Sequence, residues 1–240
     1  MNKLFDILKN NLIVSCQAEG DSPFNSPEGV TMMAKSAKLG GAVGIRSEGI
    51  EKTKMILSEV KLPTIGLVKS YFDDGYVRIT GSYKDVENLA SINCSIIAID
   101  GTFRKRENLT GPEFIKSVKD KFNCIVMADI STVEDAQACF EAGADCLSTT
   151  LSGYTPETEK LKTNKPDFFL VEQLIKNITI PVFAEGRINT PEDAGELMKL
   201  GAWGTIVGSA ITRPSLITSW YVESIKKQLD NKTDRHSVNS

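Results

Sequence analysis

The sequence predicts a single α/β domain folded as a closed (β/α)8 TIM barrel, and two observations carry this prediction. Short apolar runs rich in β-branched residues alternate with longer amphipathic stretches, and the alternation occurs eight times within 240 residues. The runs are apolar along most of their length, which is typical of parallel strands covered on both faces. An open doubly wound sheet is the alternative, but eight such regular units favour a closed barrel.

The apolar runs and the stretches between them predict the elements in order. The expected strands are residues 11–17, 41–47, 63–69, 95–101, 124–130, 145–151, 181–187 and 204–210. The expected helices, with apolar residues three or four apart, are 27–40, 50–60, 83–93, 111–123, 132–143, 168–177, 190–201 and 215–230. Thr132 and Thr190 are helix start signals, and Gly143 and Gly201 are stop signals.

The barrel is expected to occupy residues 1–230 without a second domain, because no linker or shift in composition interrupts the pattern. The remaining residues, 231–240, read NKTDRHSVNS. This polar tail is expected to be disordered.

Composition and charge exclude several classes of function. The formal net charge is -3, so the chain lacks the basic field that nucleic acid or an anionic membrane surface would require. No apolar run approaches the ~20 residues needed to cross a bilayer, and the first residues lack the pattern of a signal peptide. The five cysteines are scattered and never form a C-x-x-C pair, which argues against disulfides and zinc. We expect a cytoplasmic protein with reduced thiols.

Polar residues close almost every expected strand. In a (β/α)8 barrel the carboxyl ends of the strands meet at one mouth, where active sites form. One such residue alone is compatible with a solvated loop or a surface ion pair, but their convergence on one mouth predicts a site. In chain order these residues are Gln17, Arg46, Lys69, Asp100, Asp129, Thr149, Thr150, Glu185, Gly208 and Ser209.

Lys69 and Glu185 are the candidates for chemistry. Glu185 ends the run PVFA, where a carboxylate is costly unless its charge is needed. Lys69 follows TIGLV at the rim of an apolar barrel, a partly buried place that suits a base. Each residue also has a structural interpretation, Glu185 as a partner of a basic residue such as Arg46 and Lys69 as a partner of a nearby acid.

Two further carboxylates close expected strands. Asp129 could orient a lysine or a hydroxyl, or could cap the helix that begins near Thr132. Asp100 precedes the loop GTFRKREN, which offers it three basic partners.

The loops AEGRINTPED and VGSAITRP, after the seventh and eighth strands, predict a phosphate site. Barrel phosphate sites commonly use these two loops, where backbone N–H groups face the anion. Gly186, Gly208 and Ser209 are the expected donors, and Arg213 or Arg187 could add a charge-assisted contact. Helix capping without a ligand is the alternative.

Other chemistry is not indicated. The only histidine, His236, lies in the polar tail, so a catalytic triad or a histidine metal site is not expected. Neither a G-x-G-x-x-G fingerprint nor a Walker motif is present. A phosphate-binding site, a lysine and carboxylates together suit proton abstraction next to a carbonyl, imine chemistry at the lysine, or simple binding of a sugar phosphate.

The motifs LIVSCQA, GGAVGIR, IGLVK, MADIST, STTLSGYT, AEGRINTPED and VGSAITRP, in this order, resemble those of the N-acetylmannosamine-6-phosphate 2-epimerase family, also called N-acylglucosamine-6-phosphate 2-epimerases. The resemblance implies interconversion of N-acetylmannosamine 6-phosphate and N-acetylglucosamine 6-phosphate in the breakdown of sialic acids and amino sugars. It implies no cofactor, no metal and a homodimer.

The resemblance also assigns residues. It implies that Lys69 and Glu185 are catalytic. We expect Lys69 to take part in proton transfer at C2 of the open-chain sugar, and Glu185 to open the ring or to serve as the acid–base partner. The resemblance maps contacts with the substrate onto Gln17, Arg46, Asp129 and Arg213, with Gly186, Gly208 and Ser209 near the phosphate. From their places at a strand end and in a phosphate loop, Thr150 and Arg187 are also expected to bind the substrate. The rival interpretations are a lysine-dependent phosphosugar aldolase, a metal-assisted epimerase using Asp100, Asp129 and Glu185, and a phosphosugar-binding barrel without activity.

Overall fold

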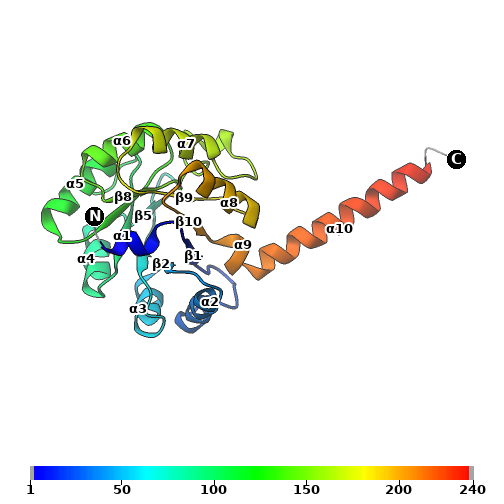
Figure 1. Ribbon diagram of the computed structural model, residues 1–240, viewed down its shortest axis with the longest axis horizontal. Coiled ribbons are helices and arrows are strands. Elements are labelled where there is room, and N and C mark those ends of the chain that lie inside the picture. Colours follow the sequence, from blue (N-terminus) through cyan, green and yellow to red (C-terminus); the bar gives the residue numbers. More distant parts are fainter. Residues whose placement is uncertain (1–2, 238–240) are drawn as a thin grey trace.

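A closed barrel of eight parallel strands forms the centre of the computed structural model (Figure 1). The structure describes the backbone of residues 3–237 and the side chains of residues 3–230. Around the barrel the strand order is β1-β10-β9-β8-β7-β6-β3-β2, which confirms the predicted fold. The barrel strands are β1 Leu12–Cys16, β2 Gly44–Glu48, β3 Thr64–Leu67, β6 Ile96–Asp100, β7 Val126–Asp129, β8 Cys146–Ser148, β9 Val182–Glu185 and β10 Gly204–Val207.

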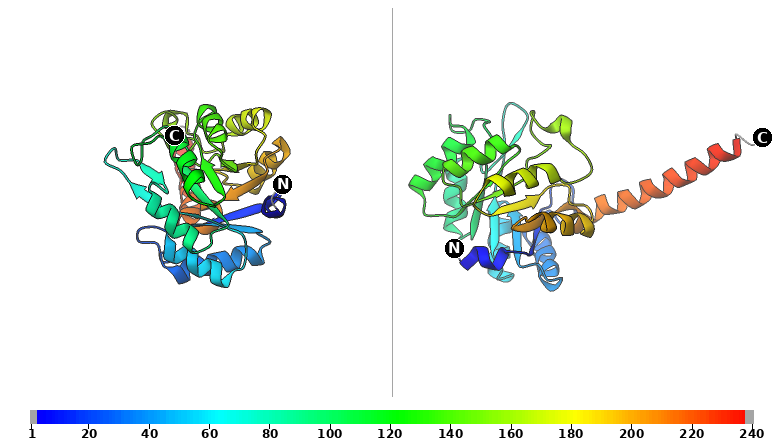
Figure 2. Two further views of the ribbon diagram at one scale, coloured as in Figure 1. Left: turned by 90° about the vertical axis from the view of Figure 1, so that its left-hand side faces the viewer. Right: turned by 45° about the horizontal axis from the view of Figure 1, so that its top comes forward.

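Helices surround the barrel (Figure 2). The predicted start and stop signals lie at the ends of these helices. The hydroxyl oxygen of Thr190 accepts a hydrogen bond from the backbone amide of Asp193 at 3.1 Å, and Thr132 forms a capping box with Asp135. Gly201 ends its helix with a left-handed φ of 108°. The helices are α1 Lys3–Leu8, α2 Pro27–Leu39, α3 Ile50–Glu59, α4 Tyr83–Ser91, α5 Gly111–Lys121, α6 Val133–Glu141, α7 Phe168–Asn177, α8 Pro191–Leu200, α9 Ser209–Thr212 and α10 Pro214–Ser237.

The core has an inner and an outer part. Aliphatic and aromatic side chains such as Ile13, Ile65 and Phe183 fill the barrel interior, and α1 closes its amino-terminal end through Phe5 and Leu8. The outer part lies between the strands and the helices. Because the interior is filled, a ligand can enter only at the mouth.

One predicted strand is divided. The run at residues 63–69 leaves the barrel after Leu67, and Lys69 begins a separate hairpin of β4 Lys69–Tyr71 and β5 Val77–Ile79. Lys69 had been expected to end a barrel strand. It instead begins a separate hairpin, so that expectation was wrong. The periodicity does not separate the two, because the apolar run continues through Val68.

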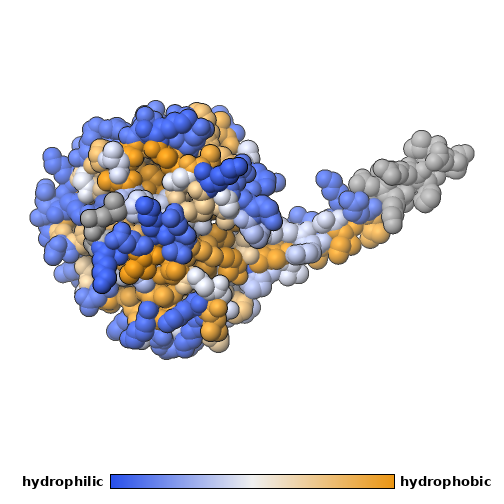
Figure 3. All heavy atoms as spheres, viewed as in Figure 1, coloured by the Kyte–Doolittle hydropathy of each residue, from blue (hydrophilic) through white to orange (hydrophobic). Residues whose placement is uncertain are grey.

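The last helix leaves the barrel. Helix α10 projects from the barrel instead of packing against it, and Figure 3 shows hydrophobic residues along its exposed length. The expected boundary at residue 230 lies inside this helix, whose backbone continues to Ser237. Residues 238–240 lie outside the described residues, so disorder of the 231–240 tail stays a prediction. Within residues 3–237, no helix is both long and apolar enough to cross a membrane.

Gly66 in β3 tests how closely α4 packs on the barrel. A Cβ at this position would lie 2.5 Å from Cys94 Sγ and 2.9 Å from Leu89 Cδ2. We expect Gly66→Ala to lower the free energy of unfolding by about 1–3 kcal/mol in urea denaturation, and the added change Cys94→Ala to restore part of it. Gly195→Ala is the control, because a Cβ there meets nothing within 4 Å. Equal stability of the Gly66 and Gly195 variants would contradict this account of the packing.

Candidate active site

A cavity of about 730 Å³ opens at the carboxyl ends of the barrel strands. This is the mouth where the strand-end residues were expected to converge. Of the residues expected to be catalytic or to bind the substrate, all but Asp129 line the cavity, namely Gln17, Arg46, Lys69, Thr150, Glu185, Gly186, Arg187, Gly208, Ser209 and Arg213. The strand-end residues Asp100 and Thr149 do not line it.

A buried ion cluster forms the floor of the cavity. Arg46 on β2 reaches across the barrel to Asp129 on β7, with Nη1–Oδ1 at 3.0 Å and Nη2–Oδ2 at 2.5 Å. Both side chains are almost completely buried. This is a planar fork of two charge-assisted hydrogen bonds, the strongest geometry available to an arginine and a carboxylate. Asp129 therefore acts from beneath the cavity and does not line it. Thr132 caps the following helix without it.

Glu185 is the second carboxylate of this cluster and the one that faces the cavity. Its Oε2 lies 3.3 Å from Arg46 Nη1. The hydroxyls of Ser148 and Thr150, from the end of β8, approach the same oxygen at 3.0 and 2.8 Å. Thr150 also contacts Asp129 Oδ1 at 3.0 Å, so its single proton is shared between the two acids. Glu185 therefore pairs with Arg46, as the structural interpretation expected, and it also lines the cavity.

One arginine faces two carboxylates, and this determines their protonation. Burial raises the pKa of Glu185, and the neighbouring charge of Asp129 raises it further, although Arg46 opposes both effects. Burial also raises the pKa of Asp129 against the attraction of Arg46. The two carboxylates in turn hold the pKa of Arg46 above its ordinary value despite burial. The cluster is therefore suited to hold one additional proton.

Lys69 also lines the cavity, just after β3, which lies four strands from β9 around the barrel. It is paired with Glu19, in the loop after β1. Glu19 Oε1 also lies 3.6 Å from Arg213 Nη2. Sequence reasoning missed Glu19 because it follows the end of β1 by several residues. Its only signal was the charge itself, in the motif SCQAEG. The predicted alternative for Lys69, pairing with a neighbouring acid, is observed.

The predicted phosphate loops lie side by side at the cavity rim. Gly186 has φ 103°, which favours glycine, and Gly208 immediately precedes α9. The amides of Ile211 and Thr212 donate to the Gly208 carbonyl, so the amides before them are outside the helical hydrogen bonding of α9.

Arg187 is held by two backbone carbonyls, and its contact with a phosphate stays a prediction. Its Nε donates to the Lys165 carbonyl at 2.8 Å, and its Nη1 donates to the Ser152 carbonyl. The guanidinium thus joins the two ends of the loop between β8 and α7. Arg187 also lines the cavity, so these two hydrogen bonds hold the loop at the edge of the candidate site.

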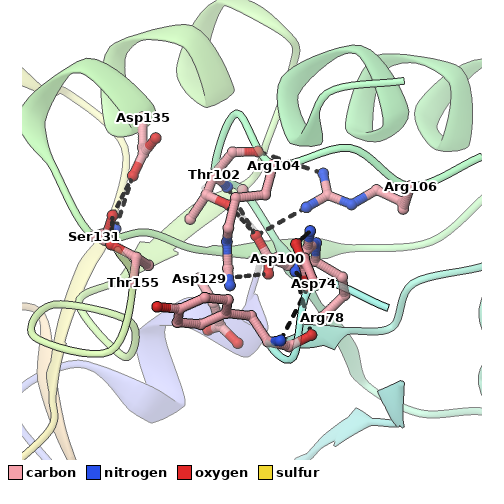
Figure 4. Close-up of polar contacts among 12 residues, drawn as sticks. Asp74, Arg78, Asp100, Thr102, Arg104, Arg106, Asp129, Ser131, Asp135 and Thr155 are labelled. Atoms are coloured by element: carbon pink, nitrogen blue, oxygen red, sulfur yellow. Dashed lines mark hydrogen bonds and ion pairs between the residues drawn. The ribbon is translucent and has the colours of Figure 1, made fainter. Parts of the chain in front are cut away.

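Asp100 lies outside the cavity. Its carboxylate accepts Arg104 Nη2 at 2.7 Å and Arg106 Nη2 at 2.9 Å, and Figure 4 shows both guanidinium groups beside it. Two of the three basic residues noted in the loop after Asp100 are therefore its partners. Within the described residues, no group of three or more acidic, cysteine or histidine side chains has the geometry of a metal site. The proposed set of Asp100, Asp129 and Glu185 is therefore not assembled.

Known proteins resemble this chain over almost its whole length. A family model described as "Putative N-acetylmannosamine-6-phosphate epimerase" matches residues 30–227. A curated protein of Clostridioides difficile, named "Putative N-acetylmannosamine-6-phosphate 2-epimerase", is 46% identical over 93% of this chain and 99% of its own length. A protein of the same name from Caldanaerobacter subterraneus is 43% identical over 92% of this chain and 93% of its own length.

Solved structures agree with this resemblance. The N-acetylmannosamine-6-phosphate 2-epimerase of Clostridium perfringens superposes with a TM-score of 0.86 at 43% identity, covering 92% of this chain and 95% of its own. A thiamine phosphate pyrophosphorylase of Pyrococcus furiosus shares only the fold, at 19% identity and a TM-score of 0.59 over 87% and 89% of the two chains.

The raised pKa of Glu185 predicts how stability depends on pH. From about pH 4.3 upward, the unfolded chain releases this proton before the folded protein does, so the free energy of unfolding falls as pH rises through the raised pKa. Glu185→Gln removes this titration. We expect the variant to avoid about 1.4 kcal/mol of that loss for each unit by which the pKa is raised.

Urea unfolding of Glu185→Gln and the wild type across this pH range measures the effect. Glu172→Gln on the surface of α7 is the control and is expected to follow the wild type. Parallel stability curves for the wild type and Glu185→Gln would contradict the prediction.

Proposed function

Because this chain belongs to the N-acetylmannosamine-6-phosphate epimerase family, we propose that it interconverts N-acetylmannosamine 6-phosphate and N-acetylglucosamine 6-phosphate by removing and returning the proton on C2. The observation that carries this proposal is that Lys69, Glu185 and Arg46 line one cavity. Lys69 follows β3 and Glu185 ends β9, and these strands lie four positions apart around the barrel. A cavity of about 730 Å³ is of the size that holds a sugar phosphate.

The chemistry requires little beyond these side chains. In the open-chain sugar, C2 lies next to the C1 aldehyde, so its proton can leave if the enolate oxygen is stabilised and a base is in place. We assign proton transfer at C2 to Lys69, and ring opening or the partner acid–base role to Glu185. Because the bond that breaks is already activated by the carbonyl, the reaction needs no redox carrier, and we propose that it is cofactor-independent.

The Arg46 cluster supports this assignment by its charge. Arg46 is fixed by Asp129 and cannot turn away, so its positive charge stays directed at the cavity floor where the enolate oxygen would lie. A preorganised charge of this kind costs no rearrangement when the reaction occurs. Thr150 and Ser148 hold Glu185 Oε2 in one position for the same reason.

The phosphate is proposed to lie at the rim formed by Gly186, Gly208 and Ser209. These three residues line the cavity from two neighbouring loops, and their backbone amides are the proposed donors. Arg213 lines the same cavity and would contribute charge while sharing Glu19 with Lys69. Gln17 donates to Ser15 Oγ at 2.8 Å, which leaves its carbonyl oxygen for a substrate hydroxyl.

The protein is proposed to be a homodimer. Tyr221, Val222 and Ile225 form an exposed apolar stripe on α10, with exposed fractions of 70%, 43% and 62%. Beside the base of α10, an apolar groove of about 390 Å³ lies between α2 and α9 over β1. The α10 helix of a second copy would cover this groove, and both apolar surfaces would be buried by one contact.

A cytoplasmic location is proposed as well. All five cysteines are free thiols, and three of them are buried in the barrel core. Reduced thiols of this kind are typical of a reducing compartment.

Proton NMR with N-acetylmannosamine 6-phosphate in D₂O, with EDTA present, tests the reaction. We expect the gluco epimer to appear with deuterium at C2. In Lys69→Gln the exchange is expected to fall by about 100-fold or more, as for loss of a general base, and Lys35→Gln, on the surface of α2, is the control. Binding without exchange would contradict the epimerase, and an adduct trapped by borohydride would point to an aldolase.

Sedimentation velocity tests the dimer. We expect the wild type to sediment as a dimer and the double variant Tyr221→Glu/Ile225→Glu as a monomer, because two charges cannot be buried in an apolar groove. Lys227→Glu on the opposite side of α10 controls for the added charge. Met32→Glu on the groove side should also give monomers. A wild type that stays monomeric at micromolar concentration would overturn this part of the proposal.

A further inference from the structure

The β4–β5 hairpin has one face toward the cavity and one face away from it. Its strands pair Lys69 with Ile79 and Ser70 with Arg78. Lys69 and Ile79 line the cavity, whereas Ser70 and Arg78 do not. Paired residues share a face of a sheet, so Lys69 and Ile79 face the cavity together. Lys69 pairs only within the hairpin and not with a barrel strand, so its position depends on how the hairpin is held.

The far end of the hairpin is held on its outer face. Arg78 is almost completely buried and pairs with Asp74 through Nη1–Oδ1 at 3.3 Å and Nη2–Oδ2 at 2.5 Å. Its guanidinium carbon also lies 4.8 Å from the centre of the Phe72 ring. Figure 4 shows Arg78 and Asp74 close together. These contacts make the hairpin a compact unit, and its junction with the barrel determines where that unit points.

That junction is Val68, the residue between the end of β3 and Lys69, and Thr80 contacts both of its backbone polar groups. The amide of Thr80 donates to the Val68 carbonyl at 2.6 Å. The amide of Val68 donates to Thr80 Oγ1 at 3.3 Å. Thr80 is fully buried, so water does not replace either contact.

Thr80 makes these two contacts in a strained backbone conformation. Its φ is 52°, a left-handed value that is unusual for a β-branched residue. Such strain persists only where the surrounding structure enforces it, and it is concentrated at functional sites. Glycine or asparagine would adopt this φ at lower cost. Neither would place a hydroxyl against the Val68 amide.

We propose that Thr80 is a positioning residue for Lys69, holding Val68 by both backbone groups so that the lysine is directed into the cavity. This inference rests on the proposed function. Thr80 touches no part of the cavity and acts only through the hairpin junction.

Steady-state kinetics of three Thr80 variants test the proposal. Thr80→Val keeps the shape and removes the hydroxyl, Thr80→Ser keeps the hydroxyl, and Thr80→Gly removes it while relieving the strain. We expect kcat to fall by roughly 10- to 100-fold in the Val and Gly variants, since a misplacement of about 1 Å has effects of this size. KM is expected to change little, and Thr80→Ser is expected to retain most of the activity.

The deuterium isotope effect at C2 separates positioning from general damage. If Lys69 is displaced, proton transfer becomes slower relative to the other steps, so the isotope effect on kcat should rise in the Val and Gly variants. Thr64→Val is the matched control. It removes a buried hydroxyl, which donates to the Leu62 carbonyl at 3.0 Å, from the opposite end of β3. This control is expected to keep the wild-type kcat and isotope effect.

Hydrogen exchange measured by mass spectrometry provides a readout independent of turnover. Peptides covering residues 68–79 should exchange faster in Thr80→Val and Thr80→Gly than in the wild type or Thr80→Ser. A wild type without epimerase activity would refute the proposed function, while exchange would still test the contact. Normal kcat in Thr80→Gly, or a loss of activity in Thr80→Ser equal to that in Thr80→Val, would overturn the role of Thr80.

Discussion

The buried guanidinium of Arg46 is the interaction on which the candidate site depends. It joins strands from different parts of the barrel, because Asp129 ends β7, Glu185 ends β9 and Arg46 lies on β2. Removing one partner of a buried ion pair costs about 3–5 kcal/mol, since an uncompensated charge remains. The cluster therefore fixes both the mouth of the barrel and the electrostatic field inside it.

The same cluster explains how two acids can serve different purposes. Asp129 is held by the arginine fork and is out of reach of a ligand, whereas Glu185 shares a weaker contact with Arg46 and faces the cavity. Burial and the charge of Asp129 raise the pKa of Glu185. An acid whose proton is retained closer to neutral pH is better suited to exchange it with a substrate.

Two elements depart from the regular barrel, the β4–β5 hairpin and the projecting helix α10. The β4–β5 hairpin carries Lys69 to the cavity that Arg46 and Glu185 also line, and Thr80 joins that hairpin to β3. Helix α10 leaves the barrel where an outer helix would otherwise pack, so an apolar groove is exposed beside it. The first departure concerns the proposed chemistry and the second the proposed assembly, and both begin at the carboxyl end of a strand.

The sequence by itself determined the barrel and most of the candidate site, because both follow from local pattern. Runs such as PVFA end in polar residues, and parallel strands bring those ends to one mouth, so Arg46, Lys69 and Glu185 could be placed in one cavity without coordinates. Tertiary structure alone decided the contacts between distant residues. Glu19 beside Lys69, Asp129 beneath the cavity and Arg187 on two loop carbonyls all depend on side-chain reach across the fold. The sequence pattern also did not predict the division at Val68, because the apolar run continues through it. It did not predict the direction of α10, because periodicity shows which face of a helix is apolar but not what will cover that face.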